Sequence, residues 1–323
     1  MVLEPAEPSA QAPAAPPRRP PALGAFGSGA LSVVFVVGLV ALPIVGLAIA
    51  PLGLIPVAQY LATGHRGVRA WGWAAAGLGL GAFLWPDSLA TAVLAAYLLV
   101  VSIPALSLEG WLRVRWSEGR WAAVTAGLGA AYCLALVATL ALPRPPVEGT
   151  RLLLRQSAAE IEQLSAASGL PQGQLALLLD TAESAMAWVL PSVPLAYLVM
   201  VLFWIRPRLP LLGFTRPTGS FEHYRSEEWL PAVFILTGAA TLLLAGTARW
   251  VALNLLVAVL ILYFVHGLAI IRAHLARWLG RGWLVRWGIG LLSLQLPLLV
   301  AALGLVDSFH ELRPQANDNG RTA

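Results

Sequence analysis

The 323-residue chain has no lysine, a single cysteine and few charged residues of either sign. The lone cysteine, Cys133, excludes a disulfide framework, and no Cys and His residues share the spacing of a metal site. Charged residues make up 11% of the chain, whereas a soluble globular domain carries roughly 25%. Together with 58% hydrophobic residues and a mean hydropathy of +0.75, this deficit excludes a soluble protein and indicates a protein of the lipid bilayer.

The chain also lacks the motifs of common enzyme classes. It contains no HExxH, no P-loop, no GxSxG and no pair of carboxylates deep within an apolar stretch. The basic residues, all of them arginine, do not form the clustered stripe that marks a nucleic-acid-binding surface. We therefore expect no catalytic activity, no cofactor and no nucleic-acid partner. The partner that the composition does predict is the lipid bilayer itself.

Apolar stretches follow one another along most of the chain, and a helix that crosses a bilayer needs about 20 mostly apolar residues. Residues 29–63 are interrupted by prolines and fit either two short spans, about 30–47 and 50–63, or one span with a re-entrant piece. Further spans are expected at about 70–85, 88–108, 121–142, 186–205, 229–247, 250–271 and 283–305. The sequence thus predicts an all-α, polytopic transmembrane helix bundle of eight or nine spans.

The two ends of the chain differ from the rest in composition. Residues 1–25 are rich in proline and alanine, and residues 314–323 are mostly polar. Neither segment has enough apolar surface to bury a core, so both are expected to be disordered tails. They flank a transmembrane domain that we place at residues 26–313.

The arginines are concentrated in alternate gaps between the apolar stretches, at 64–70, 109–120, 206–228 and 272–286. Short loops rich in arginine stay on the cytoplasmic side of a membrane, so these loops are expected inside. The 144–185 segment then lies outside the cytoplasm. Gly169 and Pro171 separate two blocks of helical leucine spacing in it, which predicts an amphipathic helical pair on the outer surface of the bundle.

Polar side chains within the predicted spans are the candidate functional groups, because a polar group in hydrocarbon is costly. The 250–271 span carries Asn254, Tyr263 and His266. At 1.5 Å per residue, Asn254 and His266 lie about 18 Å apart along the helix, and Tyr263 is one turn from His266. These groups either line a ligand cavity or form interhelical hydrogen bonds, which contribute about 0.6–2 kcal/mol to packing.

The last predicted span adds Gln295 as a partner for these groups, and Asp307 follows at its outer end. An ionisable group near the membrane interface costs less than one at the centre, so Asp307 is expected as a solvated end charge or in an ion pair with a nearby arginine. With so few ionisable groups in the spans, the sequence offers little for proton- or ion-coupled chemistry. The candidate ligand or packing residues are Asn254, Tyr263, His266, Gln295 and Asp307.

The C-terminal half carries a more specific pattern in two stretches, NLLVAVLILYFVHGLAII at 254–271 and ALGLVDSFHELR at 302–313. Both resemble the YybS-like family of uncharacterised bacterial multi-pass membrane proteins (domain of unknown function 2232). The resemblance implies a location in the bacterial inner (cytoplasmic) membrane. It also points to the positions Pro191, Trp229, Asn254, Tyr263, Gly267, Gly304 and Asp307. At His266 the chain departs from the family pattern, which favours glutamine.

That family is distantly similar to the substrate-binding subunits of energy-coupling-factor vitamin transporters, which suggests a first function. The chain would be a substrate-binding or permease-like subunit for a small molecule, with a cavity lined by the last three spans and an ATPase partner docked on the arginine-rich loops. The alternative is a non-transporting membrane scaffold that recruits envelope or division proteins. A closed interior, in which Asn254, Tyr263 and His266 bond to neighbouring helices, would count against the first function.

Overall fold

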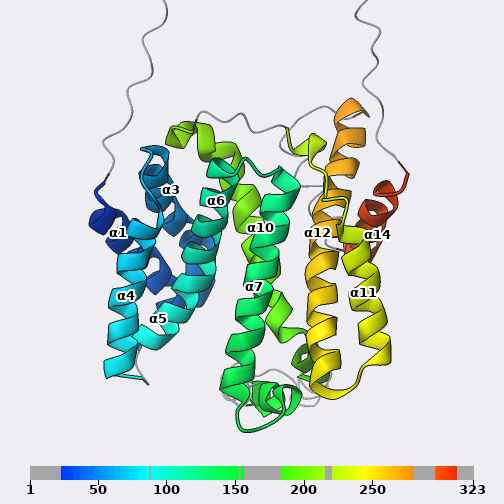
Figure 1. The fold of residues 1–323 in the computed structure, drawn as a ribbon, viewed down its shortest axis with the longest axis horizontal. Helices are drawn as coiled ribbons and strands as arrows, with labels where there is room; N and C mark the ends of the chain where they lie inside the picture. The colour runs from blue at the N-terminus through cyan, green and yellow to red at the C-terminus, as the bar shows by residue number, and fades with distance from the viewer. Residues whose placement is uncertain are drawn as a thin grey trace, which may run out of the picture.

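The computed structural model describes residues 23–86, 89–152, 154–155, 183–214, 220–278 and 295–310. Within these ranges the chain consists of helices and short connections, without a strand, which confirms the all-α prediction (Figure 1). In chain order the elements are α1 (Ala25–Ala41), α2 (Pro43–Ile49), η1 (Ala50–Gly53), α3 (Leu54–Ala62), α4 (Val68–Leu84), α5 (Leu89–Tyr97), η2 (Leu98–Ser102), α6 (Ile103–Arg113), α7 (Glu118–Ala141), η3 (Leu190–Ser192), α10 (Val193–Ile205), η4 (Arg206–Leu212), η5 (Phe221–His223), α11 (Leu230–Leu243), α12 (Gly246–Trp278) and α14 (Pro297–Asp307). The η elements are 3-10 helices except η2, which is π-helical.

Among the described residues, five helical runs are long and apolar enough to cross a membrane: Val45–Ala62, Leu89–Arg113, Glu118–Ala141, Glu183–Leu212 and Gly246–Leu275. Three shorter helices, α1, α11 and α14, are also apolar. Every stretch that the sequence predicts as a span overlaps one or more of these helices or α4, although 283–305 is described only from residue 295 onward. Hydropathy therefore located the helices correctly along the described chain.

The N-terminal helices pack around α1 (Figure 1). α1 ends at Ala41, and the run from α2 through η1 to α3 packs against it. Pro43 and Pro51 stand in the first turns of α2 and η1, where a missing backbone N–H costs little. Ser32 of α1 and Tyr97 of α5 share a buried hydrogen bond of 2.8 Å, which fixes α1 against the helix that follows α4.

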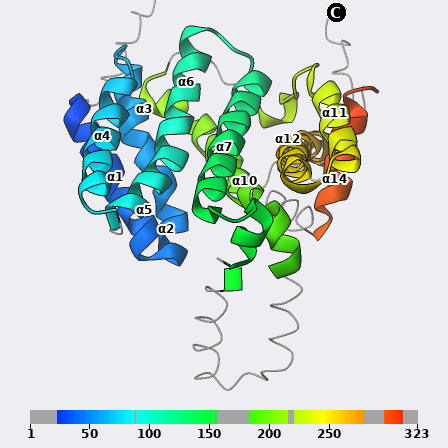
Figure 2. The same ribbon diagram turned by 60° about the horizontal axis from the view of Figure 1, so that its bottom comes forward.

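The C-terminal helices surround α12, which contacts α7, α10, α11 and α14 (Figures 1 and 2). α12 has 33 residues, which at 1.5 Å each gives a helix about 50 Å long, longer than the hydrocarbon core of ~30 Å. Figure 2 views α12 nearly along its axis and shows α14 lying across it rather than beside it. The helical run before α10 is interrupted by η3, which contains Pro191.

Several predictions fall wholly or largely outside the described residues. These are the tails at 1–25 and 314–323 and the middle of the predicted outer helical pair, from 156 to 182. The described parts of the 144–185 segment are helical from 146 to 152 and again from Glu183. Arg155 and Glu183 form an ion pair of 2.9 Å that joins the two described parts of this segment.

Candidate functional site at the crossing of α12 and α14

Two glycines bring the backbones of α12 and α14 into direct contact. A Cβ atom added at Gly267 would overlap the carbonyl oxygen of Val300, and one added at Gly304 would overlap the carbonyl oxygen of Tyr263. Small residues permit this kind of close approach between helices in a membrane. Because the two backbones are this close, polar side chains of α12 and α14 near the crossing come within hydrogen-bonding distance of each other.

An ionisable pair lies at this crossing. His266 Nε2 and Asp307 Oδ2 are 2.9 Å apart, and the two residues are only 2% and 8% exposed. The second ring nitrogen of His266, Nδ1, lies 2.8 Å from the hydroxyl of Ser226. Ser226, His266 and Asp307 therefore form a continuous hydrogen-bonded chain from the segment before α11, through α12, to α14.

The sequence prediction put Asp307 at the outer end of a span at 283–305, on the side opposite the 206–228 loop. The helix containing Asp307 starts only at Pro297, after a break at Leu296, and it crosses α12 steeply. Asp307 therefore bonds to His266, close to the predicted cytoplasmic loop that carries Ser226. His266 and Asp307 place one buried ionisable pair in spans that the sequence describes as nearly uncharged.

Asn254, near the other end of α12, has all the hydrogen-bonding groups of its amide engaged. Its Nδ2 donates to the carbonyls of Trp188 and Trp250 at 2.8 Å each, and Ser192 Oγ donates to its Oδ1 at 2.7 Å. Ser192 closes η3, so the interrupted helix is tied to α12 at the interruption itself. This arrangement is the interhelical hydrogen bond that the sequence left as one of two alternatives.

The remaining predicted residues take no part in these bonded chains. Tyr263 is fully buried, and its ring meets the ring of Phe234 edge-on at 6.1 Å. Its backbone carbonyl faces Gly304, so it belongs to the α12–α14 crossing. Gln295 is exposed. The structure thus brings together His266, Tyr263 and Asp307, places Asn254 far along the same helix, and leaves Gln295 outside the cluster.

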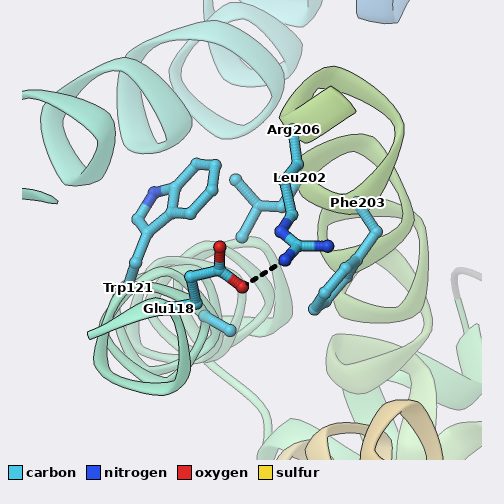
Figure 3. A pocket seen from close by; sticks show the side chains of 6 residues that line it. Glu118, Trp121, Leu202, Phe203 and Arg206 are labelled. Atoms are coloured by element: carbon cyan, nitrogen blue, oxygen red, sulfur yellow. Dashed lines mark ion pairs between the residues drawn. The ribbon is translucent and has the colours of Figure 1, made fainter. Parts of the chain in front are cut away.

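The sequence missed a second charged cluster at the start of α7. Arg206 is only 5% exposed, and its Nη2 lies 2.5 Å from Oε2 of Glu118 (Figure 3). Trp121, Leu202 and Phe203 line the adjoining cavity, whose volume of about 10 Å³ corresponds to roughly one water molecule. Ser117 before an apolar run is the signature of a helix start, but nothing in the sequence indicates that Glu118 and Arg206 meet.

The segment at 220–229 connects the two clusters. Ser226 contacts His266, Glu222 pairs with Arg272 of α12 at 3.6 Å, and Glu227 accepts a hydrogen bond from Ser117. Tyr224 is buried, with its ring edge-on to Phe203 at 5.0 Å. These contacts hold the segment across the ends of α7, α10 and α12. Among the described residues, no three His, Cys, Asp or Glu side chains meet in a way that could hold a metal ion.

The comparisons with known proteins add one match. A family model described as "Predicted membrane protein (DUF2232)" matches residues 30–308, which is most of the chain and includes every residue of the α12–α14 crossing discussed above. No curated protein and no solved structure matches the sequence.

Proposed function

The chain belongs to the DUF2232 family of predicted membrane proteins, and we propose that it is a substrate-binding or permease-like subunit for a small molecule in the bacterial inner membrane. The arginine-rich loops lie in the cytoplasm and offer the surface for an ATPase partner. The chain crosses the membrane eight or nine times. The amphipathic pair at 144–185 lies outside.

The observation that carries the proposal is the interrupted helix that faces α12. Membrane transporters commonly build their substrate sites where a spanning helix is broken, because the break exposes backbone and side-chain polar groups inside the bundle. Here the break at η3 contains Pro191, and Ser192 presents its hydroxyl to the amide of Asn254. A neutral hydroxyl and an amide favour a polar, uncharged small molecule.

The same groups are bonded to each other in this structure, which indicates a closed bundle. A ligand would replace the bond between Ser192 and Asn254 and would require η3 to separate from α12. The cavity between Glu118 and Arg206 has room for about one water, so it does not serve as the substrate site. The proposal therefore includes a second, open arrangement of the helix that contains η3.

One observation favours the alternative, a non-transporting scaffold. Asn254 and His266 both bond to neighbouring elements, as expected for side chains whose role is helix packing. In that case the protein contributes a surface to envelope or division proteins, and the interior bonds only hold the bundle together.

Co-purification separates the two functions. The wild-type protein, Asn254→Ala and Ser192→Ala would be extracted into lipid nanodiscs, and the small molecules and proteins retained would be identified by mass spectrometry. Thr237→Ala is the matched control, because the Thr237 hydroxyl bonds only to carbonyls of its own helix, those of Val233 and Phe234.

A small molecule retained by the wild type and the control, but lost from both site variants, is the expected result. Retention that is equal in all four proteins would contradict a site at η3. Recovery of envelope proteins alone, with no enriched small molecule, would replace the permease-like function with the scaffold.

A further inference from the structure

We propose that His266 and Asp307, together with Ser226, form a proton-binding site that exchanges protons with the cytoplasmic side. The inference deepens the proposed function by naming the proton as the ligand that accompanies the small molecule. The coupling role and the cytoplasmic side rest on the proposed function, whereas proton binding itself can be measured without a substrate.

The geometry provides both a place for the proton and a route to it. Carboxylate and imidazole groups buried inside a membrane bundle are characteristic of proton relays, and these two are 2.9 Å apart in a nearly inaccessible crossing. An imidazole can accept a proton at one nitrogen and release one from the other. Both nitrogens of His266 have a partner for such a transfer, because Nδ1 faces Ser226 and Nε2 faces Asp307.

The transfer can be followed atom by atom. A proton that arrives through the Ser226 hydroxyl binds His266 at Nδ1, and the ring then carries protons on both nitrogens. The Nε2 proton moves to Oδ2 of Asp307, which leaves a neutral imidazole and a neutral carboxylic acid. The site as a whole has gained one proton, and no bond other than N–H and O–H has formed or broken.

Access from the cytoplasmic side follows from the location of Ser226. It is half-buried, while Arg225 before it and Glu228 two residues after it are exposed. The opposite end of α12 is tied by Asn254, about 18 Å away along the helix axis. Water that reaches the 220–229 segment is thus separated from His266 only by the Ser226 hydroxyl. Water on the outer side is separated from His266 by most of the length of the span.

Several described titratable groups lie on the elements that pack around the pair. Tyr224 faces His266 edge-on at 6.3 Å, and burial raises the pKa of Tyr224, so this phenol stays neutral. Glu222 is paired with Arg272, and Glu227 with Arg120 at 3.8 Å. On α12 and at the end of α14, Tyr263, Arg272 and His310 are the nearest described titratable or charged residues along the chain.

Infrared difference spectroscopy on the full-length protein in nanodiscs tests the site. Spectra recorded at low and high pH should differ by the carbonyl band of a protonated carboxylic acid, and Asp307→Asn should remove that part of the difference. Ser226→Ala should keep the band but slow its appearance after a pH jump, by an amount on the order of tenfold or more. Ser308→Ala is the matched control, because its hydroxyl bonds to the Gly304 carbonyl and not to His266.

A carboxylic acid band that is identical in the wild type and Asp307→Asn would overturn the proposal. So would a rate in Ser226→Ala equal to that in Ser308→Ala, because the route through Ser226 would then be wrong. Thermal unfolding of each variant shows whether it is folded. If Asp307→Asn does not fold, the rate measured in Ser226→Ala still tests the proposal. Loss of the small molecule in the co-purification experiment would leave these spectra unchanged, so the two proposals fail independently.

Discussion

The two ends of α12 are tied to their neighbours by different chemistry. Near the end that the proposed topology places outside (the outer end), Asn254 has every donor and acceptor of its amide bonded, to Ser192 and to two backbone carbonyls. Near the other end, which the same topology places inside (the inner end), His266 bonds to a carboxylate and to a hydroxyl from a loop. An amide cannot change its charge, whereas the inner pair can gain or lose a proton. α12 is thus held at one end by hydrogen bonds between neutral groups. At the other end it is held by a hydrogen bond whose strength depends on protonation.

The energies of the two ties should differ accordingly. A neutral interhelical hydrogen bond in a membrane contributes about 0.6–2 kcal/mol. Removing His266 leaves the buried carboxyl group of Asp307 without its partner, and an unpaired buried charge costs roughly 3–5 kcal/mol. The comparison between the ends is therefore measurable by substitution.

Replacing one member of the inner pair should have the largest effect. We expect His266→Leu to lower the free energy of unfolding by roughly 3 kcal/mol or more, because Asp307 loses its imidazole partner in an apolar crossing. Unfolding by SDS titration in mixed micelles measures this. The double variant His266→Leu/Asp307→Leu should recover most of the loss, since it buries apolar groups in place of the pair. A loss from His266→Leu of less than about 1 kcal/mol, below the range for a buried pair, would show that the pair does not hold the crossing.

Adding a side chain at the crossing should have the next largest effect. Gly304→Ala places a Cβ against the carbonyl of Tyr263, so we expect a loss of about 1–3 kcal/mol from overpacking. Gly77→Ala in α4 is the control, because nothing lies within 4 Å of a Cβ there. Its helix should gain up to about 1 kcal/mol from the better propensity of alanine. Equal effects at the two glycines would mean that α14 does not cross α12 at Gly304.

The outer end should show the smallest effect. Asn254→Ala removes the side-chain bond to η3, and we expect a loss of about 0.6–2 kcal/mol, the same at every pH at which the fold is stable. Thr237→Ala, which touches only its own helix, should cost less. A pH-dependent loss in Asn254→Ala would contradict the assignment of a purely neutral tie to this end.

How well the helices and the polar contacts could be predicted from the sequence depends on which interactions produce them. Apolar length and the positions of Pro43 and Pro51 fix the helices, so hydropathy located them well. Single polar residues in an apolar span also stand out, which made Asn254 and His266 visible as candidates. Their partners were not visible, because Ser192 and Ser226 lie far from them in the sequence and look like ordinary loop or turn serines.

The error at Asp307 has a specific cause. A hydropathy window measures how apolar a stretch is and does not measure whether it runs straight. The break at Leu296 and the glycine contact at Gly304 turn α14 across α12, and that places Asp307 beside His266, which contacts Ser226 of the 220–229 segment. Gly267 and Gly304 were matched through the family resemblance, but only the packed structure shows that they touch opposite backbones.

The comparison of the two ends depends on their facing opposite sides of the membrane, and cysteine labelling tests this most directly. In a Cys133→Ser background, single cysteines would replace Glu160 in the 144–185 segment and Ser220 at the start of the 220–229 segment. In intact cells, an impermeant thiol reagent should label position 160 and should reach position 220 only after the membrane is opened. Labelling of both positions from the same side would contradict the account.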